Sequence, residues 1–395
     1  MEDKKLLLTS QLPRVASLNV LFAIFFKNGL IFSLTNMRYP SKRILASAVL
    51  AGILGLLFLG IGVVMYGRTG GIELAERLGV PRPVIIAHRG ASYLAPEETA
   101  PAYLLAREMG VDYLELDLQR TKDGVLIARH DDDLRRTTNI AEVFPGREMD
   151  TIDKFTFAEL QSLDAGSWFN KQFPDRARAS LKNVTILRLE DVMNIAEGGD
   201  HKPGLYIETK SARRFPGIEK QIVEILTAHG WIRPLSRGVS ESPRTEHARV
   251  PARVIFQSFE SDSLALLKEL APQVPAVLLI DESMMRKDGW DALLRKAKQV
   301  GVGIGTWGYR WSRDPDWSIK DAPNRYLTTW PWYTGQAHRT GLLVHPWTVD
   351  DRWEMWMASL FGADGFFTNR PDLALLFYGR ADHIDLKPMW ERIGY

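Results

Sequence analysis

Two stretches, VIIAHRG (Val84–Gly90) and YLELDLQ (Tyr113–Gln119), decide the expected fold. Each is an apolar strand pattern that carries or leads into charged residues, and a helical pattern over Ala100–Met109 separates them. A strand, a helix and a second strand in this order are typical of a parallel βαβ unit. In a parallel barrel the carboxyl ends of the strands form the catalytic face, so we expect the charged residues of both stretches to meet there.

The same alternation continues along the chain. Further strand patterns lie over Val125–Arg129, Leu205–Glu208, Val254–Gln257, Ala276–Ile280, Gly303–Thr306, Leu342–His345 and Gly365–Thr368, and further helical patterns over Pro216–His229, Ser263–Leu270, Trp290–Gln299 and Asp351–Phe361. With the first two, nine candidate strands compete for the eight places of a TIM (β/α)8 barrel. We therefore predict an α/β fold with a TIM barrel over residues 83–395 and a small helical insertion over residues 135–183.

The composition agrees with one large domain and narrows the functional classes. The 395 residues are 45% hydrophobic and 25% charged, as in an ordinary packed protein. The net charge of +2 gives no overall basic excess, so no nucleic-acid partner is expected. The absence of Cys excludes disulfides, Cys-ligated metals and a thiol nucleophile. No pattern specifies an oligomeric state.

The residues before the barrel predict a membrane anchor. The uncharged run Ile44–Tyr66 is long enough for a helix to cross a hydrocarbon core of roughly 30 Å, and it is longer than the apolar region of a cleaved signal peptide. Arg38, Lys42 and Arg43 precede the run, whereas Arg68 alone follows it closely, which places the N-terminal side in the cytoplasm. A cleaved signal remains the alternative.

The expected domain order follows from this anchor. Residues 1–43 form a cytoplasmic N-terminal segment, residues 44–66 a transmembrane helix and residues 67–82 a linker to the barrel. Met37 opens a more usual start, so residues 1–36 are interpreted as a mis-annotated extension. The protein would then be a single-pass membrane protein whose catalytic domain faces the periplasm or the cell exterior.

Acidic and imidazole side chains gather at the first strand patterns. His88 and Arg89 follow the first strand, and His130 closes the third in LIARHDD. Glu115 and Asp117 share one face of their strand because side chains alternate along it. Buried carboxylates are costly without a cation, so a metal or an Arg or Lys is expected between them.

A later strand repeats this geometry and suggests the chemistry. Glu208 and Lys210 in YIETK add a third carboxylate and a cation. Oxygen ligands without Cys favour one divalent cation, Mg²⁺ or Ca²⁺, although a metal-free salt-bridge network with Arg89 and Lys210 is an alternative. A divalent ion, an arginine and two imidazoles suit phosphoester cleavage, because they neutralise phosphoryl charge and transfer protons.

The ordered motifs resemble the glycerophosphodiester phosphodiesterase family. They are HRGASYLAPEET (His88–Thr99), YLELDLQRTKDG (Tyr113–Gly124), HDDDLRRTT (His130–Thr138), DAGSWF (Asp164–Phe169), YIETK (Tyr206–Lys210), QSF (Gln257–Phe259), HPWTV (His345–Val349) and FTNRPD (Phe367–Asp372). The resemblance implies a TIM barrel with a helical insertion after the third strand. It also implies metal-dependent hydrolysis of glycerophosphodiesters to glycerol 3-phosphate and an alcohol.

Roles follow from the resemblance. His88 and His130 would be the catalytic acid/base pair, the metal ligands would be Glu115, Asp117 and Glu208, and the substrate-binding residues would be Arg89, Lys210 and Glu97. Glu97 would be either a further ligand or a holder of the glycerol hydroxyls.

One further substrate contact is expected from the aromatic residues. Trp347 lies at the expected barrel mouth, where its ring can contact an acyl chain or a choline. Two positions depart from the family pattern, because the family usually has Asn or His in place of Glu98 and Asn in place of Asp350.

Two other functions compete with glycerophosphodiester hydrolysis. The anchor and the tryptophans also suit a lysophospholipid substrate, cleaved in the manner of a lysophospholipase D. A membrane-tethered binding module without catalysis is the third hypothesis, but it predicts an incomplete set of histidines and carboxylates, whereas the full set is present.

Overall fold

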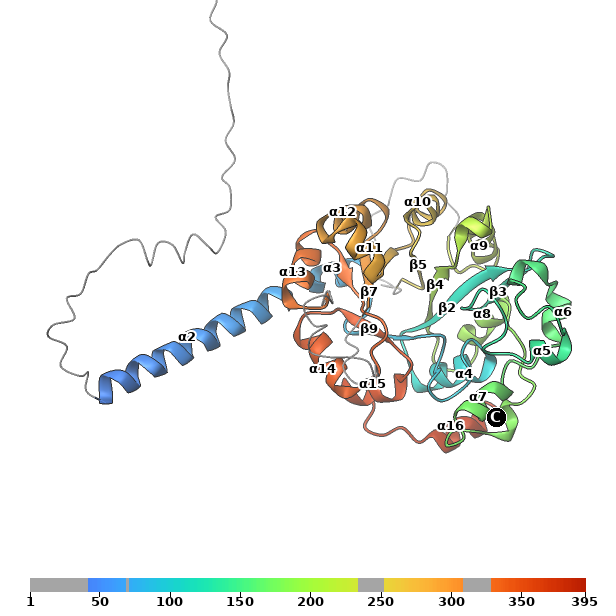
Figure 1. Ribbon diagram of the computed structural model, residues 1–395, viewed down its shortest axis with the longest axis horizontal. Coiled ribbons are helices and arrows are strands. Elements are labelled where there is room, and N and C mark those ends of the chain that lie inside the picture. Colours follow the sequence, from blue (N-terminus) through green and yellow to red (C-terminus); the bar gives the residue numbers. More distant parts are fainter. Residues whose placement is uncertain (1–41, 69–70, 234–251, 308–327) are drawn as a thin grey trace, which may run out of the picture. The chain divides into compact units, whose positions relative to one another are not determined.

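The computed structural model describes residues 42–68, 71–233, 252–307 and 328–395 (Figure 1). Contacts divide the chain into two compact units, Met1–Phe58 and Leu59–Tyr395. The expected N-terminal segment, apart from its last two residues, lies outside the described residues.

Helix α2 (Lys42–Arg68) covers the whole of the expected Ile44–Tyr66 span. Large apolar side chains are exposed along it, and Leu56 and Phe58 are each 71% exposed. Across the described part of the chain, however, no helix meets the combined requirement of length and apolar character for crossing a membrane, so the transmembrane assignment is not confirmed.

The second unit is built around a single sheet. Its strands are β1 (Val84–Ala87), β2 (Tyr113–Arg120), β3 (Leu126–Ala128), β4 (Gly204–Thr209), β5 (Val254–Ser258), β6 (Ala276–Ile280), β7 (Gly303–Thr306), β8 (Leu343–Val344) and β9 (Gly365–Thr368). Along the sheet the order is β8-β7-β6-β5-β4-β2-β1-β9, and every neighbouring pair in this order is parallel. Backbone hydrogen bonds from Asp364 to Val344 (2.9 Å) and from Phe367 to Pro346 (3.0 Å) join the two ends. The fold is therefore a nearly closed eight-stranded parallel barrel, as predicted.

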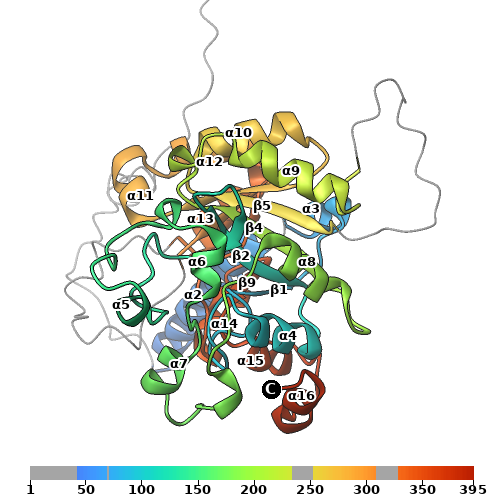
Figure 2. The same ribbon diagram turned by 90° about the vertical axis from the view of Figure 1, so that its right-hand side faces the viewer.

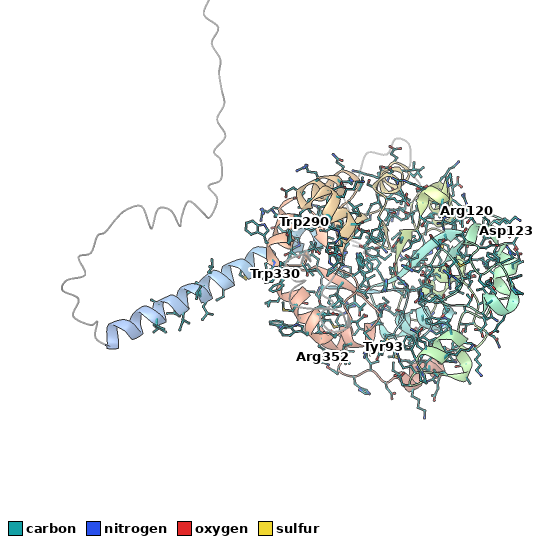
Figure 3. All side chains as sticks on the ribbon, in the orientation of Figure 1. Tyr93, Arg120, Asp123, Trp290, Trp330 and Arg352 are labelled. Atoms are coloured by element: carbon teal, nitrogen blue, oxygen red, sulfur yellow. The ribbon has the colours of Figure 1, made fainter. Side chains whose placement is uncertain are left out.

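Strand β3 resolves the competition among the nine candidate strands. It pairs antiparallel with β2, with Ala128 opposite Leu118, and stands outside the barrel order. Of the nine candidates, β3 is the one that is not a barrel strand, because only the short turn around Gly124 separates it from β2 and a parallel crossover needs a much longer connection. Arg120 and Asp123 mark this hairpin in Figure 3.

Helices surround the strands in both views of the second unit (Figures 1 and 2). They are α3 (Gly71–Leu78), α4 (Ala100–Met109), α8 (Leu189–Glu197), α9 (Ile218–Ala228), α10 (Ser261–Leu270), α11 (Glu282–Asp288), α12 (Trp290–Val300), α13 (Pro331–Arg339), α14 (Arg352–Leu360), α15 (Pro371–Phe377) and α16 (Leu386–Arg392). The stretch expected to be a linker thus contains α3, whose Leu74 and Ala75 are buried against the inner barrel residues Val84 and Ile86.

The insertion forms a small helical layer with its own core. It contains α5 (Ile140–Val143), α6 (Phe157–Gln161) and α7 (Ser167–Gln172), together with 3-10 turns at Ile152–Lys154 and Ala179–Leu181. Ile140, Ile152 and Phe155 are fully or almost fully buried and pack with Ile127 of β3. The hairpin and the insertion therefore share one apolar cluster.

Candidate active site

The first strand delivers His88 and Arg89 through a tight turn. Arg89 has φ +54° and Gly90 has φ +83°, and a Cβ atom at Gly90 would come within 2.7 Å of the Ala102 backbone. Only glycine fits there, because both the backbone conformation and the space exclude a side chain. The turn points the Arg89 backbone N at Glu115, whose Oε2 accepts its hydrogen bond at 2.8 Å.

Strand register brings the carboxylates to two adjacent levels of the barrel. Asp117 of β2 pairs with Glu208 of β4, and Glu208 pairs with Gln257 of β5. Glu115 lies two residues before Asp117 and therefore on the same inward face. Glu115 accepts a hydrogen bond from Gln257 Nε2 at 2.9 Å. The structure thus brings the three expected ligands together.

The β2–β3 hairpin returns His130 to the same place. Because β3 runs back along β2, the chain reaches the level of the carboxylates again, and Arg129 N donates to the Asp117 carbonyl at 2.7 Å. His130 thus lines the same pocket as the carboxylates, and it is carried by a hairpin and not by the end of a barrel strand.

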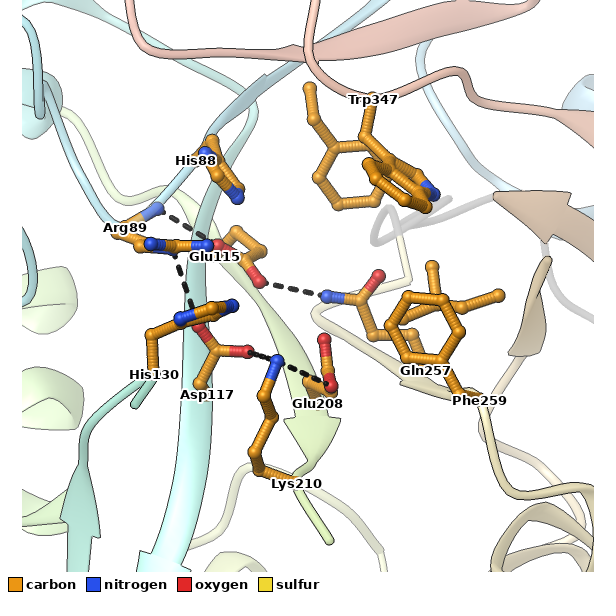
Figure 4. A pocket seen from close by; sticks show the side chains of 12 residues that line it. His88, Arg89, Glu115, Asp117, His130, Glu208, Lys210, Gln257, Phe259 and Trp347 are labelled. Carbon is orange, nitrogen blue, oxygen red and sulfur yellow. Dashed lines mark hydrogen bonds and ion pairs between the residues drawn. The ribbon is translucent and has the colours of Figure 1, made fainter. Parts of the chain in front are cut away.

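One pocket collects these groups (Figure 4). It is lined by His88, Arg89, Glu115, Asp117, His130, Glu208, Lys210, Gln257, Phe259, Leu279, Trp347 and Phe367. Of the predicted site residues, Glu97 does not line it. Its carboxylate is held behind Arg89, where it accepts from Arg89 at 3.0 Å and from Arg136 at 2.6 and 2.8 Å. Those contacts hold the Glu97 pKa at about 2 despite burial.

The pocket has a charged wall and an apolar wall. Phe259 and Trp347 meet edge to face with ring centroids 5.8 Å apart, and Leu279 and Phe367 continue the apolar wall. Figure 4 shows Trp347 and Phe259 across the pocket from His130 and Lys210. A substrate in this pocket would therefore meet a polar and an apolar surface at once.

The buried carboxylates carry strongly perturbed pKa values. Burial, and then the charge of Asp117, raises the pKa of Glu115 well above its ordinary value and that of Glu208 to about 8. Burial opposes ionisation of Asp117 too, but Lys210, His130 and Arg89 hold its pKa well below the usual range. The Lys210 ammonium lies 3.5 Å from Asp117 and 3.2 Å from Glu208.

This carboxylate set fits a divalent cation. Glu115, Asp117 and Glu208 are all buried, and each offers an oxygen within 4.8 Å of the others. Asp117 Oδ2 is buried without a hydrogen-bond partner, although Arg89 Nε lies 3.5 Å away. Oxygen ligands of this kind suit Mg²⁺ or Ca²⁺, and a bound cation would offset the burial and the repulsion that raise the pKa of Glu115 and Glu208.

The two histidines have different partners. His88 Nδ1 contacts Asn369 Oδ1 at 2.8 Å, and burial followed by the charge of Arg89 lowers the pKa of His88 to about 3. His130 Nδ1 contacts Asp131 Oδ1 at 2.7 Å, and Arg136 Nε binds the other Asp131 oxygen at 2.6 Å. Hydrogen bonds from both neighbours hold the pKa of Asp131 below its usual range despite burial.

Several of these partners were not predicted from the sequence. Asp131 directly follows His130, and that adjacency was a usable local signal. Gln257 and Arg136 lie inside recognised motifs, but their motifs gave them no role. Asn369 is 281 residues from His88, so only the pairing of β1 with β9 brings the two together.

A parallel barrel with three buried carboxylates, two imidazoles and two cations in one pocket defines a hydrolase site suited to a phosphodiester. The chain belongs to the glycerophosphoryl diester phosphodiesterase family, whose sequence profile matches residues 88–373. A glycerophosphodiester phosphodiesterase of Bacillus subtilis is 35% identical over 332 residues, which cover 84% of this chain and 96% of that protein. The chain is therefore an enzyme of the class that hydrolyses phosphoric diesters.

Solved structures support the fold. The structure of a glycerophosphoryl diester phosphodiesterase from Silicibacter pomeroyi matches with a TM-score of 0.58 and 23% identity. The match covers 78% of this chain and 97% of that chain. A phosphodiesterase of Oleispira antarctica, solved with its product sn-glycerol-3-phosphate, has a TM-score of 0.51 and 22% identity, covering 75% of this chain and 97% of that chain. At these identities the likeness concerns the barrel alone.

Proposed function

We propose that the chain hydrolyses glycerophosphodiesters to glycerol 3-phosphate and an alcohol, with one divalent cation, Mg²⁺ or Ca²⁺, and two catalytic histidines. One observation carries this proposal: both histidines and all three carboxylates line the same pocket as Arg89 and Lys210. The product bound by the Oleispira antarctica phosphodiesterase is consistent with the same half of the substrate binding here.

The charged wall binds the phosphate in this mechanism. Glu115, Asp117 and Glu208 would hold the cation, which when bound neutralises phosphoryl charge. Arg89 and Lys210 orient the phosphoryl oxygens, because both cations lie at the pocket wall. Glu97 acts from behind Arg89 and limits the positions that its guanidinium can take.

Proton transfer is divided between the histidines. The lowered pKa of His88 keeps its imidazole neutral at physiological pH, so His88 accepts the proton of the attacking oxygen. His130 Nδ1 contacts the Asp131 carboxylate, which orients the ring, so His130 delivers a proton to the leaving alcohol.

An assay on glycerophosphocholine tests this proposal. Purified full-length protein should release glycerol 3-phosphate with added Mg²⁺ or Ca²⁺ and should stop releasing it with a chelator. Release of phosphocholine in place of glycerol 3-phosphate, or turnover that survives exhaustive chelation, would contradict it.

Lysophospholipid cleavage is the second candidate, and the apolar wall favours it. Phe259, Leu279 and Trp347 offer a surface that an acyl chain can cover, whereas a free glycerophosphodiester leaves most of it in contact with water. A parallel assay on lysophosphatidylcholine separates the two substrates. A kcat/KM at least about tenfold higher for the lysolipid, equivalent to about 1.4 kcal/mol, would make it the preferred substrate.

We also propose that α2 anchors the protein in a membrane, with the barrel on the periplasmic or outer side. The exposed apolar side chains of α2 and the basic residues before it support this placement. Membrane fractionation combined with protease added outside intact cells tests it. A soluble product that begins after Tyr66 would contradict the anchor, and protection of the barrel would contradict its orientation.

A further inference from the structure

A short chain of hydrogen bonds leads from Asp350 to the ring of His88. Asp350 Oδ1 accepts from the Asn369 backbone N at 2.7 Å, and Asp350 Oδ2 accepts from Asn369 Nδ2 at 2.8 Å. On its other side, Asn369 Oδ1 lies 2.8 Å from His88 Nδ1 and 2.7 Å from Ser92 Oγ. Both carboxylate oxygens thus hold the same asparagine that contacts the histidine.

The chemistry of these groups fixes the direction of each hydrogen bond. A carboxylate only accepts, so the NH2 group of Asn369 must face Asp350 and its carbonyl oxygen must face His88. Since a carbonyl oxygen cannot donate, His88 Nδ1 must carry a proton. Nε2, the other ring nitrogen, is then the one that gains or loses a proton at the pocket.

We infer that Asp350 is a positioning residue for the reaction: acting through Asn369, it sets which nitrogen of the His88 ring exchanges a proton with the substrate. The inference rests on the proposed function, in which His88 is the base. It also gives a physical reason for the departure at position 350, because a carboxylate there can accept both hydrogen bonds from Asn369.

The variant Asp350→Asn should reverse the arrangement. An asparagine at position 350 has a single acceptor atom, Oδ1, and the Asn369 backbone N holds that oxygen on its own side. Its NH2 group would then face the NH2 group of Asn369, and the Asn369 amide would turn over to relieve the clash. Once turned, Asn369 would donate to His88 Nδ1, and the ring proton would move to Nε2.

Exchanging the two residues should restore the original arrangement. In the double variant Asp350→Asn with Asn369→Asp, the new amide donates to one oxygen of the new carboxylate. The second carboxylate oxygen then faces His88 Nδ1, which again must donate. The composition of the pair is unchanged, so the comparison isolates the direction of the hydrogen bonds.

The proton position is measured on full-length protein with ¹⁵N-labelled histidine and saturating Ca²⁺ or Mg²⁺, by two-bond ¹H–¹⁵N correlation spectra. The His88 signals are assigned by their loss in His88→Gln, since the chain has 8 His. The matched control is Asp351→Asn, because Asp351 is the adjacent carboxylate but caps α14 by accepting from Glu354 N at 2.9 Å.

Wild type and the control should show the Nδ1-protonated ring, Asp350→Asn the Nε2-protonated ring, and the double variant the wild-type pattern. On glycerophosphocholine, Asp350→Asn should lower kcat at least about tenfold with KM changed by less than about twofold, and the double variant should recover most of the loss. An unchanged ring proton in Asp350→Asn, or no recovery on exchange, overturns the inference. If the ring proton moves as expected while wild type cleaves no diester, the proposed function fails and the role of Asp350 in placing the proton stands.

Discussion

His88 and His130 face the same pocket from regions that are built differently. His88 directly follows barrel strand β1, and its ring contacts a neutral amide, Asn369. His130 sits on a hairpin outside the barrel order, with its side chain 31% exposed, and its ring contacts a carboxylate that is itself bound by Arg136. The difference teaches that one site can give two imidazoles partners of different charge, and the proposed mechanism assigns the two rings opposite proton transfers on this basis.

The largest effect is expected from removing what the two histidines share. Asp117 faces both rings and is an expected metal ligand, so Asp117→Ala should abolish cation binding and lower turnover by at least about 10³-fold. Chelation of the wild type should have the same effect, reversed by Mg²⁺ or Ca²⁺. Calorimetric titration with the cation and the release of glycerol 3-phosphate measure both changes. Asp262→Ala, on an 82% exposed side chain, is the control. Full turnover by the metal-free Asp117→Ala protein would rule out the cation site.

Removing one histidine at a time should show which of the two is the base and which is the acid. His88→Ala and His130→Ala should each lower turnover of glycerophosphocholine by at least about 10²-fold, and the double variant should lose less than the product of the two. A p-nitrophenyl diester needs no proton on its leaving group, so His130→Ala should recover on it whereas His88→Ala should not. Recovery in the opposite variant would exchange the two roles.

A milder change tests the charge on the hairpin side alone. In Asp131→Asn the amide can still accept from His130 Nδ1, but the negative charge is gone and the contact with Arg136 weakens. We expect kcat on glycerophosphocholine to fall about tenfold, less than in His130→Ala, because the ring remains in place. Unchanged kcat in Asp131→Asn would show that the charge of this partner does not matter.

The smallest expected effect is on the free energy of unfolding, and it comes from Glu354, which contacts the backbone of Asp350. Glu354 accepts from the Asp350 backbone N, and burial raises its pKa to about 7 from 4.5. A carboxyl group with a raised pKa in the folded protein holds its proton more tightly there, so its contribution to stability is lost as pH rises from about 4.5 to 7. Glu354→Gln should therefore raise the free energy of unfolding at pH 8 by roughly 1–3 kcal/mol and have little effect at pH 4. Denaturant unfolding at both pH values measures the difference, and an equal effect at both would exclude titration of Glu354.

The sequence predicted those parts of the site that depend only on neighbouring residues along the chain. Glu115 and Asp117 could be placed on one face because alternation along a strand needs no knowledge of the neighbours. His130 lies in the pocket with the other predicted residues, but the sequence did not show that a hairpin carries it, because an apolar run of three to five residues does not reveal whether it pairs parallel or antiparallel. Glu97 was predicted to contact substrate or metal, because the pattern of its motif does not reveal that Arg136 binds its carboxylate.

The partners of the histidines were harder to predict for a physical reason. Asn369 reaches His88 only because β9 and β1 are neighbours in the barrel, with Thr368 opposite Ala87. Asp350 reaches Asn369 across 19 residues that include all of α14. Such contacts depend on closure of the sheet, which strand order determines and local pattern does not.

The separate apolar cluster of the hairpin and insertion has a consequence for heat inactivation. His130, Asp131 and Arg136 belong to this part, whose cluster around Ile152 and Phe155 is separate from the barrel core, whereas Leu126 and Phe169 of the same part pack into that core. Segments with their own small core can open before the whole domain does. On heating, catalysis should thus disappear at a lower temperature than the circular dichroism of the barrel, so the working limit of the enzyme is set by its attached hairpin and insertion.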